Sequence, residues 1–159
     1  MNFFNRSQGA IPDLLSSILY DETTFYNQFK HDLLLAQKEV IIESPFISTH
    51  RMQELRSLFE KIIHKGIKVY IFTRDPKEHC EEYEMQSEAE VQYFERLGVQ
   101  VLLCIGNHHR KLAMVDRKIL WEGSLNILSQ IHSREIMRRT VSPKMTQEMF
   151  DFLKFSRWI

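Results

Sequence analysis

Short β-branched segments alternate with segments of helical periodicity along most of this chain, and this alternation restricts the fold more than any other feature. The predicted strands are residues 38–43, 67–72, 99–105 and 118–123, with a further strand within 134–141. The predicted helices are residues 21–36, 50–64 and about 88–97, with a last helix from about residue 145. Strands that alternate with helices are typical of the α/β class, so we predict a mixed β-sheet flanked by helices.

Length and composition indicate a single domain. The chain has 159 residues, of which 43% are hydrophobic and 26% charged, and this is enough to form one sizeable core. We expect an N-terminal extension over residues 1–20 and a folded domain over 21–159. Thr49 is the predicted cap of the second helix, and Gly66 and Gly98 follow the predicted ends of two helices. The acidic stretch 75–90 reads as a solvated loop and helix face.

Several classes of protein do not fit this sequence. No apolar run of about 18 residues is present, so no membrane insertion is expected. The first residues lack the pattern of a secretory signal, and the two cysteines form no disulfide framework, so a cytoplasmic location is expected. His108–His109 and His79–Cys80 do not have the spacing of a zinc site. We therefore expect neither a metal nor a cofactor.

The net charge is formally zero, but the charges are unevenly distributed. Residues 101–159 hold 10 Lys and Arg against 5 Asp and Glu, whereas residues 1–100 hold 11 against 16. A basic excess in the second part suits an anionic substrate. Ordinary variation over a solvated surface is the competing interpretation.

Candidate chemistry is concentrated in residues 106–135. His109, Lys111 and Asp116 have the spacing H-x-K-x4-D, and G-S-L-N at 123–126 follows. In extended backbone, His109 and Lys111 project to the same side, and so do Ser124 and Asn126. An imidazole, an ammonium, a hydroxyl and an amide on one surface suit a phosphate group. Asp116 has the opposite parity, so a turn or buried structural role competes with a catalytic one.

These residues resemble the HKD motif and the following G-S-x-N element of the phospholipase D superfamily. The segments E-S-P-F-I-S and F-T-R-D-P are similar to the ends of the two strands that precede the motif in that family. The resemblance implies a phospholipase D-like fold and a metal-independent phosphodiesterase with a covalent phosphohistidine intermediate. It implies that His109 is nucleophile or general acid and that Lys111, Ser124 and Asn126 hold the phosphate. It also implies that Glu135 orients the His109 ring, with a plain surface salt bridge as the alternative.

The family mechanism uses two HKD histidines, yet this chain has one HKD copy. None of its other six histidines, among 7 in total, is followed by lysine two positions later. A twofold homodimer would bring His109 of each copy to one phosphate, so we expect a homodimer.

The expected substrate is nucleic acid, with DNA favoured over RNA, because the chain is basic around the motif and lacks a clear lipid-seeking helix. A nuclease of this kind would need restraint, for which a regulatory partner protein is one means. Two alternatives stay open. One is a phospholipase D or phosphatidyl-transfer enzyme, for which residues 11–19 are the only apolar candidate. The other is a non-catalytic module that binds phosphate or nucleic acid.

Overall fold

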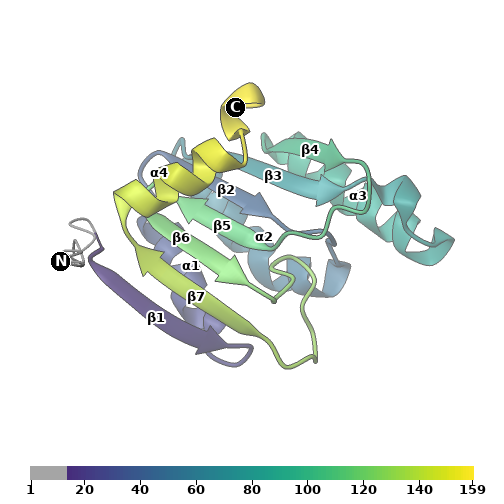
Figure 1. Cartoon of the computed structure of the whole chain (residues 1–159). Helices are drawn as coiled ribbons and strands as arrows, with labels where there is room; N and C mark the ends of the chain where they lie inside the picture. The colour runs from purple at the N-terminus through teal and green to yellow at the C-terminus, as the bar shows by residue number, and fades with distance from the viewer. Residues whose placement is uncertain (1–13) are drawn as a thin grey trace, which may run out of the picture.

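The computed structural model describes residues 14–159, which form one seven-stranded sheet with helices on both faces (Figure 1). The strands follow one another across the sheet in the order β1-β7-β6-β5-β2-β3-β4. Their bounds are β1 Ser16–Asp21, β2 Glu39–Glu43, β3 Lys68–Arg74, β4 Gln100–Cys104, β5 Leu112–Val115, β6 Ile119–Gly123 and β7 Ile136–Val141.

The sheet is mixed. Strands β2, β3 and β4 run parallel to one another, and β5 joins β2 in the antiparallel sense. From β5 onward the sheet continues through antiparallel pairs to β6, β7 and finally β1 at the edge. The α/β class and the mixed sheet predicted from the alternation of segments are confirmed.

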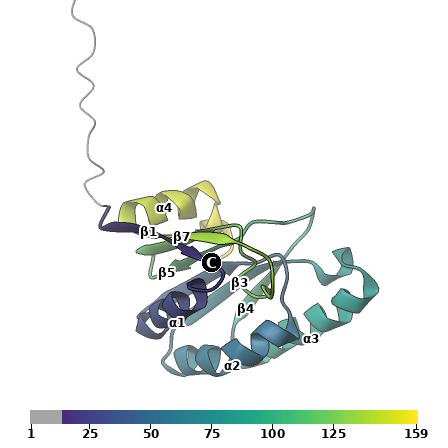
Figure 2. The same cartoon turned by 90° about the horizontal axis from the view of Figure 1, so that it is seen from below.

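Three helices cover one face of the sheet and one covers the other (Figure 2). The first set is α1 Phe25–Leu35, α2 Thr49–His64 and α3 Glu81–Leu97, and the opposite helix is α4 Pro143–Phe152. Short 3-10 turns lie at Pro76–Glu78 and Phe155–Arg157. Because side chains alternate along a strand, Val40 and Ile42 of β2 join the larger core under the three helices, while Ile41 joins the smaller core under α4.

The structure differs from the sequence prediction at three places. The unpredicted strand β1 includes residues 16–20 of the expected extension, whose residues 1–13 lie outside the described part of the chain. Helix α3 begins at Glu81 rather than near residue 88, because acidic side chains in a first turn interact favourably with the helix dipole. Ser48, not Thr49, caps α2 by accepting a hydrogen bond from the Arg51 amide at 3.3 Å.

A buried carboxylate fastens α1 to the antiparallel part of the sheet. Asp32 is 2% exposed and accepts hydrogen bonds from Arg139 at 2.7 and 2.8 Å. The Trp121 indole also donates to it, at 2.9 Å. Trp121 and Phe150 are buried, whereas Trp158 is exposed. This packing fixes β6 and β7, whose ends carry part of the candidate site.

Candidate active site

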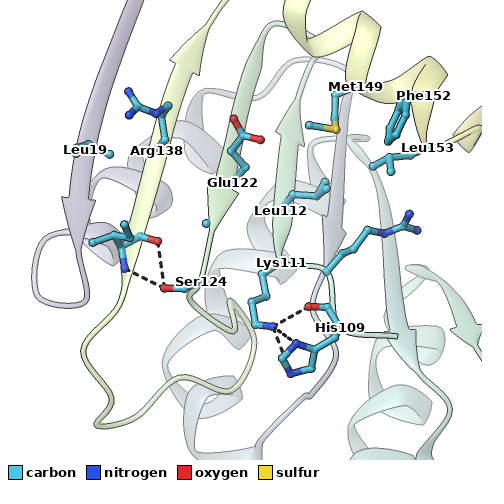
Figure 3. A pocket seen from close by; sticks show the side chains of 13 residues that line it. Leu19, His109, Lys111, Leu112, Glu122, Ser124, Arg138, Met149, Phe152 and Leu153 are labelled. Carbon is cyan, nitrogen blue, oxygen red and sulfur yellow. Dashed lines mark hydrogen bonds between the residues drawn. The ribbon is translucent and has the colours of Figure 1, made fainter. Parts of the chain in front are cut away.

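The predicted histidine and lysine lie at the rim of an open depression of about 750 Å³ on the α4 face of the sheet (Figure 3). Polar side chains from the ends of β5, β6 and β7 occupy one part of it, and apolar side chains from β1, β5 and α4 occupy the rest. Its lining includes His109, Lys111, Ser124, Leu19 and Phe152.

His109 and Lys111 are in direct contact. The Lys111 ammonium lies 2.7 Å from Nδ1 of the His109 ring and donates to the His109 carbonyl, also at 2.7 Å. An ammonium can only donate, so the ring nitrogen that faces it must carry no hydrogen. Partial burial lowers the pKa of Lys111, and the negative charge of Glu135 acts in the opposite direction. The sequence prediction that these two side chains share one side of the chain agrees with this geometry.

Ser124 borders the same depression, just beyond the end of β6. Its hydroxyl accepts a hydrogen bond from the Ile136 amide at 3.1 Å, and its own amide donates to the Ile136 carbonyl at 3.0 Å. The preceding Gly123 is required by this close approach, because a Cβ at that position would lie 2.1 Å from the Ile136 carbonyl oxygen. The glycine of the G-S-L-N element therefore lets β6 and β7 meet and sets the place of Ser124.

Asn126 does not line the depression, which differs from the sequence prediction. Strand β6 ends at Gly123, so the alternation that would align Ser124 with Asn126 stops there. The Asn126 side-chain oxygen is buried and has no hydrogen-bond partner among residues 14–159. Its carbonyl accepts from the amides of Ser129 and Gln130 and so shapes the loop that follows β6.

Glu135 lies beside the site without a hydrogen bond to His109 among the described residues. Its carboxylate accepts from the Ser133 hydroxyl at 2.7 Å, and with Ser124 it lines a smaller hollow next to the main depression. Arg139, which follows on the same strand, pairs with Asp32, so it is not the salt-bridge partner of Glu135. The geometry places Glu135 close enough to act on the charge of Lys111, and a role in orienting His109 stays a prediction.

Asp116 lies at the opposite end of β5 from Lys111, separated from it by the four residues of that strand. It occupies the turn before β6 with a φ of 53°, a conformation that Asp tolerates. Its carboxylate accepts the backbone amides of Gln37, Lys38 and Glu39 at 3.0, 2.8 and 3.1 Å. The structural alternative for Asp116 fits this geometry, and the catalytic one does not.

Replacing Asp116 with alanine should lower stability and leave the chemistry intact. Three backbone amides would lose their acceptor, so we expect a loss of about 1–3 kcal/mol in the free energy of unfolding. Asp116→Asn, which keeps one acceptor oxygen and tolerates the turn, should lose less. Denaturant unfolding measures the loss, and activity well below the midpoint should equal that of the wild type. Loss of activity at unchanged stability would instead assign Asp116 to the chemistry.

The residues on either side of His109 contact a buried carboxylate that was not predicted from the sequence. Glu43, the last residue of β2, is 0% exposed and accepts a hydrogen bond from Arg110 at 2.8 Å. His108 Nε2 lies 3.7 Å from the same oxygen. Burial raises the pKa of Glu43, and Arg110 opposes this. Burial, helped by the positive charge of Arg110, lowers the pKa of His108 to about 4. One sequence signal could have identified Glu43: it is a charged residue at the end of the apolar segment that predicts the strand 38–43.

The described part of the chain offers neither a metal-binding cluster nor a membrane-spanning helix. Within residues 14–159, no three His, Cys, Asp or Glu side chains are grouped so that they could hold a metal ion. No helix in the same range is long and apolar enough to span a bilayer.

The family model described as the PLD-like domain of cardiolipin synthase matches residues 29–154, most of the chain. The chain belongs to the phospholipase D superfamily. Within this superfamily, it is similar in structure to NucT from Helicobacter pylori, with a TM-score of 0.70 and 19% identity over 87% of this chain and 93% of NucT. It is also similar to Nuc from Salmonella typhimurium, a phospholipase D family member, with a TM-score of 0.73 and 14% identity over 90% and 93% of the two chains.

A larger structure from the same comparison shares the fold over part of its length. Phosphatidylserine synthase from Haemophilus influenzae gives a TM-score of 0.65 and 16% identity, covering 86% of this chain but 36% of the synthase. No curated protein sequence was found to match the chain. At these identities the similarities establish the phospholipase D-like fold. Similarity over nearly the full length of Nuc and NucT agrees with a chain that holds one copy of the motif.

Proposed function

We propose that this protein is a metal-independent phosphodiesterase, an endonuclease of DNA or RNA that acts through a phosphohistidine in a site shared by two copies of the chain. The observation that carries the proposal is the contact between the His109 ring and the Lys111 ammonium, 2.7 Å apart at the rim of an open depression. A nucleophile beside a cation suits a phosphate that carries negative charge throughout the reaction.

The proposed reaction has two displacements. In the first, a ring nitrogen of one His109 attacks phosphorus, the bond to the leaving oxygen breaks, and that oxygen takes a proton from the second copy's His109. In the second, the same second imidazole removes a proton from water, whose oxygen attacks phosphorus and releases the first His109. Lys111, Ser124 and Asn126 are proposed to hold the non-bridging oxygens. Lys111 and Ser124 line the depression, and Asn126, which is part exposed with its side-chain oxygen buried, would donate through its amide nitrogen.

The second copy is proposed to cover the apolar part of the depression. Leu19, Ile136 and Phe152 are 58%, 62% and 80% exposed, and all three line the depression that His109 borders. Exposed apolar side chains grouped at one place mark an interaction surface. A twofold partner seated there would place its own His109 near the first, and this supplies the second imidazole that one copy lacks.

Nucleic acid is the proposed substrate, and DNA is favoured over RNA. Arg110 and Arg138 border the depression, and Arg134 lines the hollow beside it, so the rim is basic. Contacts of this kind address the phosphate backbone without reading bases. The same apolar lining also favours a second candidate, a phospholipase D or phosphatidyl-transfer enzyme, because acyl chains would occupy it in place of a second copy.

Cleavage of nucleic acid should persist when divalent metal ions are removed. We expect plasmid DNA and single-stranded DNA to be cut as fast in excess EDTA as in Mg²⁺. The reason is that Lys111 and a protonated histidine offset the negative charge of the phosphate. The measurement compares DNA, RNA and phosphatidylcholine vesicles side by side, each with EDTA and with Mg²⁺. A strict requirement for Mg²⁺ would contradict the proposal, and release of choline without DNA cleavage would favour the lipid candidate.

A further inference from the structure

The segment that carries His109 lies outside the sheet. Strand β4 ends at Cys104 and β5 begins at Leu112, so His109 is not fixed by a ladder of strand hydrogen bonds. Side chains hold the segment instead. At its start, the Glu78 carboxylate accepts the amides of Gly106 and Asn107 at 2.7 and 3.1 Å. Placement of the reactive imidazole therefore depends on side-chain contacts more than on backbone pairing.

Glu43 contacts the residues on both sides of His109. Its Oε1 accepts a hydrogen bond from Arg110 at 2.8 Å and lies 3.7 Å from Nε2 of His108. His109 and the exposed part of Arg110 border the depression, whereas His108 is not among its lining residues. Because Glu43 binds the guanidinium of Arg110 and lies against the ring of His108, one carboxylate restrains the neighbours of His109 on both sides. Restraint of both neighbours restricts the direction of the His109 side chain.

Burial of the Glu43 carboxylate lowers the free energy of unfolding, so stability alone does not account for it. The Glu43 carboxylate is 0% exposed, and its second oxygen and His108 Nε2 are buried without hydrogen-bond partners among the described residues. The Arg110 side chain is 51% exposed, so its charge is partly screened by water and offsets only part of the desolvation cost. An apolar side chain at the end of β2, with an uncharged one in place of Arg110, would avoid that cost, because replacing a whole buried ion pair with apolar groups is often neutral or stabilising.

We propose that Glu43 is the positioning residue for His109. By binding Arg110 and packing against His108, it keeps the imidazole at the angle from which it can attack, or protonate, a phosphodiester. This inference rests on the proposed function for its kinetic consequence. Its structural part, the control of the His109 ring by Glu43, can be measured without any turnover.

The test compares Glu43→Gln with Glu39→Gln. Glu39 is on the same strand and pairs with Arg117 at 2.6 Å, but it lies at the far end of β2, so it is a matched control. With bis(p-nitrophenyl) phosphate, Glu43→Gln should lower kcat by about 10- to 100-fold with little change in KM, because small misplacements of a reacting group cost that much. Glu39→Gln should leave both constants unchanged. Glu43→Leu, which removes the carboxylate and leaves the half-exposed Arg110 to water, should be as inactive as Glu43→Gln, and thermal unfolding checks that it folds.

The ring of His109 provides a second readout that needs no catalysis. In ¹H–¹³C NMR spectra of histidine-labelled protein, its signal is assigned by its loss in His109→Ala. We expect this signal to move or broaden in Glu43→Gln and to stay in place in Glu39→Gln. An unmoved signal together with an unchanged kcat would overturn the inference. A wild type that hydrolyses no phosphodiester would refute the proposed function alone, and the NMR comparison would then decide the role of Glu43.

Discussion

The His109→Ala variant is expected to lose phosphodiester hydrolysis by about 1,000-fold or more, because both displacements of the proposed reaction pass through this imidazole. The fold should be unaffected. His109 is exposed, lies outside the strands, and has Lys111 as its hydrogen-bond partner. Hydrolysis of bis(p-nitrophenyl) phosphate and of single-stranded DNA measures the loss, and thermal unfolding checks the fold.

The matched control for this variant is His132→Ala, since His132 is also exposed and outside the strands. It should retain the activity of the wild type on both substrates. Trapping gives an independent readout: acid quenching during turnover should yield an acid-labile phosphoryl adduct in the wild type and none in His109→Ala. Full activity of His109→Ala on either substrate would contradict the proposed mechanism.

Phe152→Glu is expected to separate the two copies and to abolish activity with them. Phe152 is 80% exposed at the end of α4 and lines the depression that the second copy is proposed to cover. A carboxylate there would meet its own symmetry mate or an apolar surface, and both are unfavourable. We expect a monomer in light scattering and a loss of activity of about 100-fold or more, because one copy supplies a single imidazole.

Met85→Glu is the control for this surface. Met85 is 73% exposed on α3, which packs on the other face of the sheet, so this variant should stay dimeric and active. Mixed dimers test the shared site directly. When half of the subunits carry His109→Ala and exchange freely, activity should fall to about a quarter of the wild-type value rather than to half. A Phe152→Glu monomer with full activity would show that one copy suffices.

The fold class could be predicted from the sequence because strand and helix periodicities are local. Strand β1 could not, since Ser16–Asp21 is a short edge strand whose pairing with β7 is a tertiary contact between distant segments. The early start of α3 was not predicted because its first turn is acidic and was interpreted as part of a solvated stretch. In the structure this turn contains Glu81, Glu82 and Glu84.

The candidate site was predicted in part. His109 and Lys111 followed from their spacing and parity, and the structure brings them into contact. The parity argument failed for Asn126, because it assumed a strand that continues past Gly123, where the chain leaves the sheet. Glu43 was missed because its partners, His108 and Arg110, lie more than 60 positions away, with Arg110 67 positions along the chain. Periodicity and motif spacing in one sequence do not predict a tertiary contact between residues so far apart in the chain.

The position of Asp116 shows that the three residues of the HKD motif do not share one structural role. Two of them, His109 and Lys111, border the depression, and the third, Asp116, closes a turn at the far end of β5 by binding the amides of residues 37–39. Loss of this aspartate should therefore loosen the join between the start of β2 and the end of β5 and leave the contact between His109 and Lys111 in place. In this chain, the third residue of the motif reports how the sheet is held together.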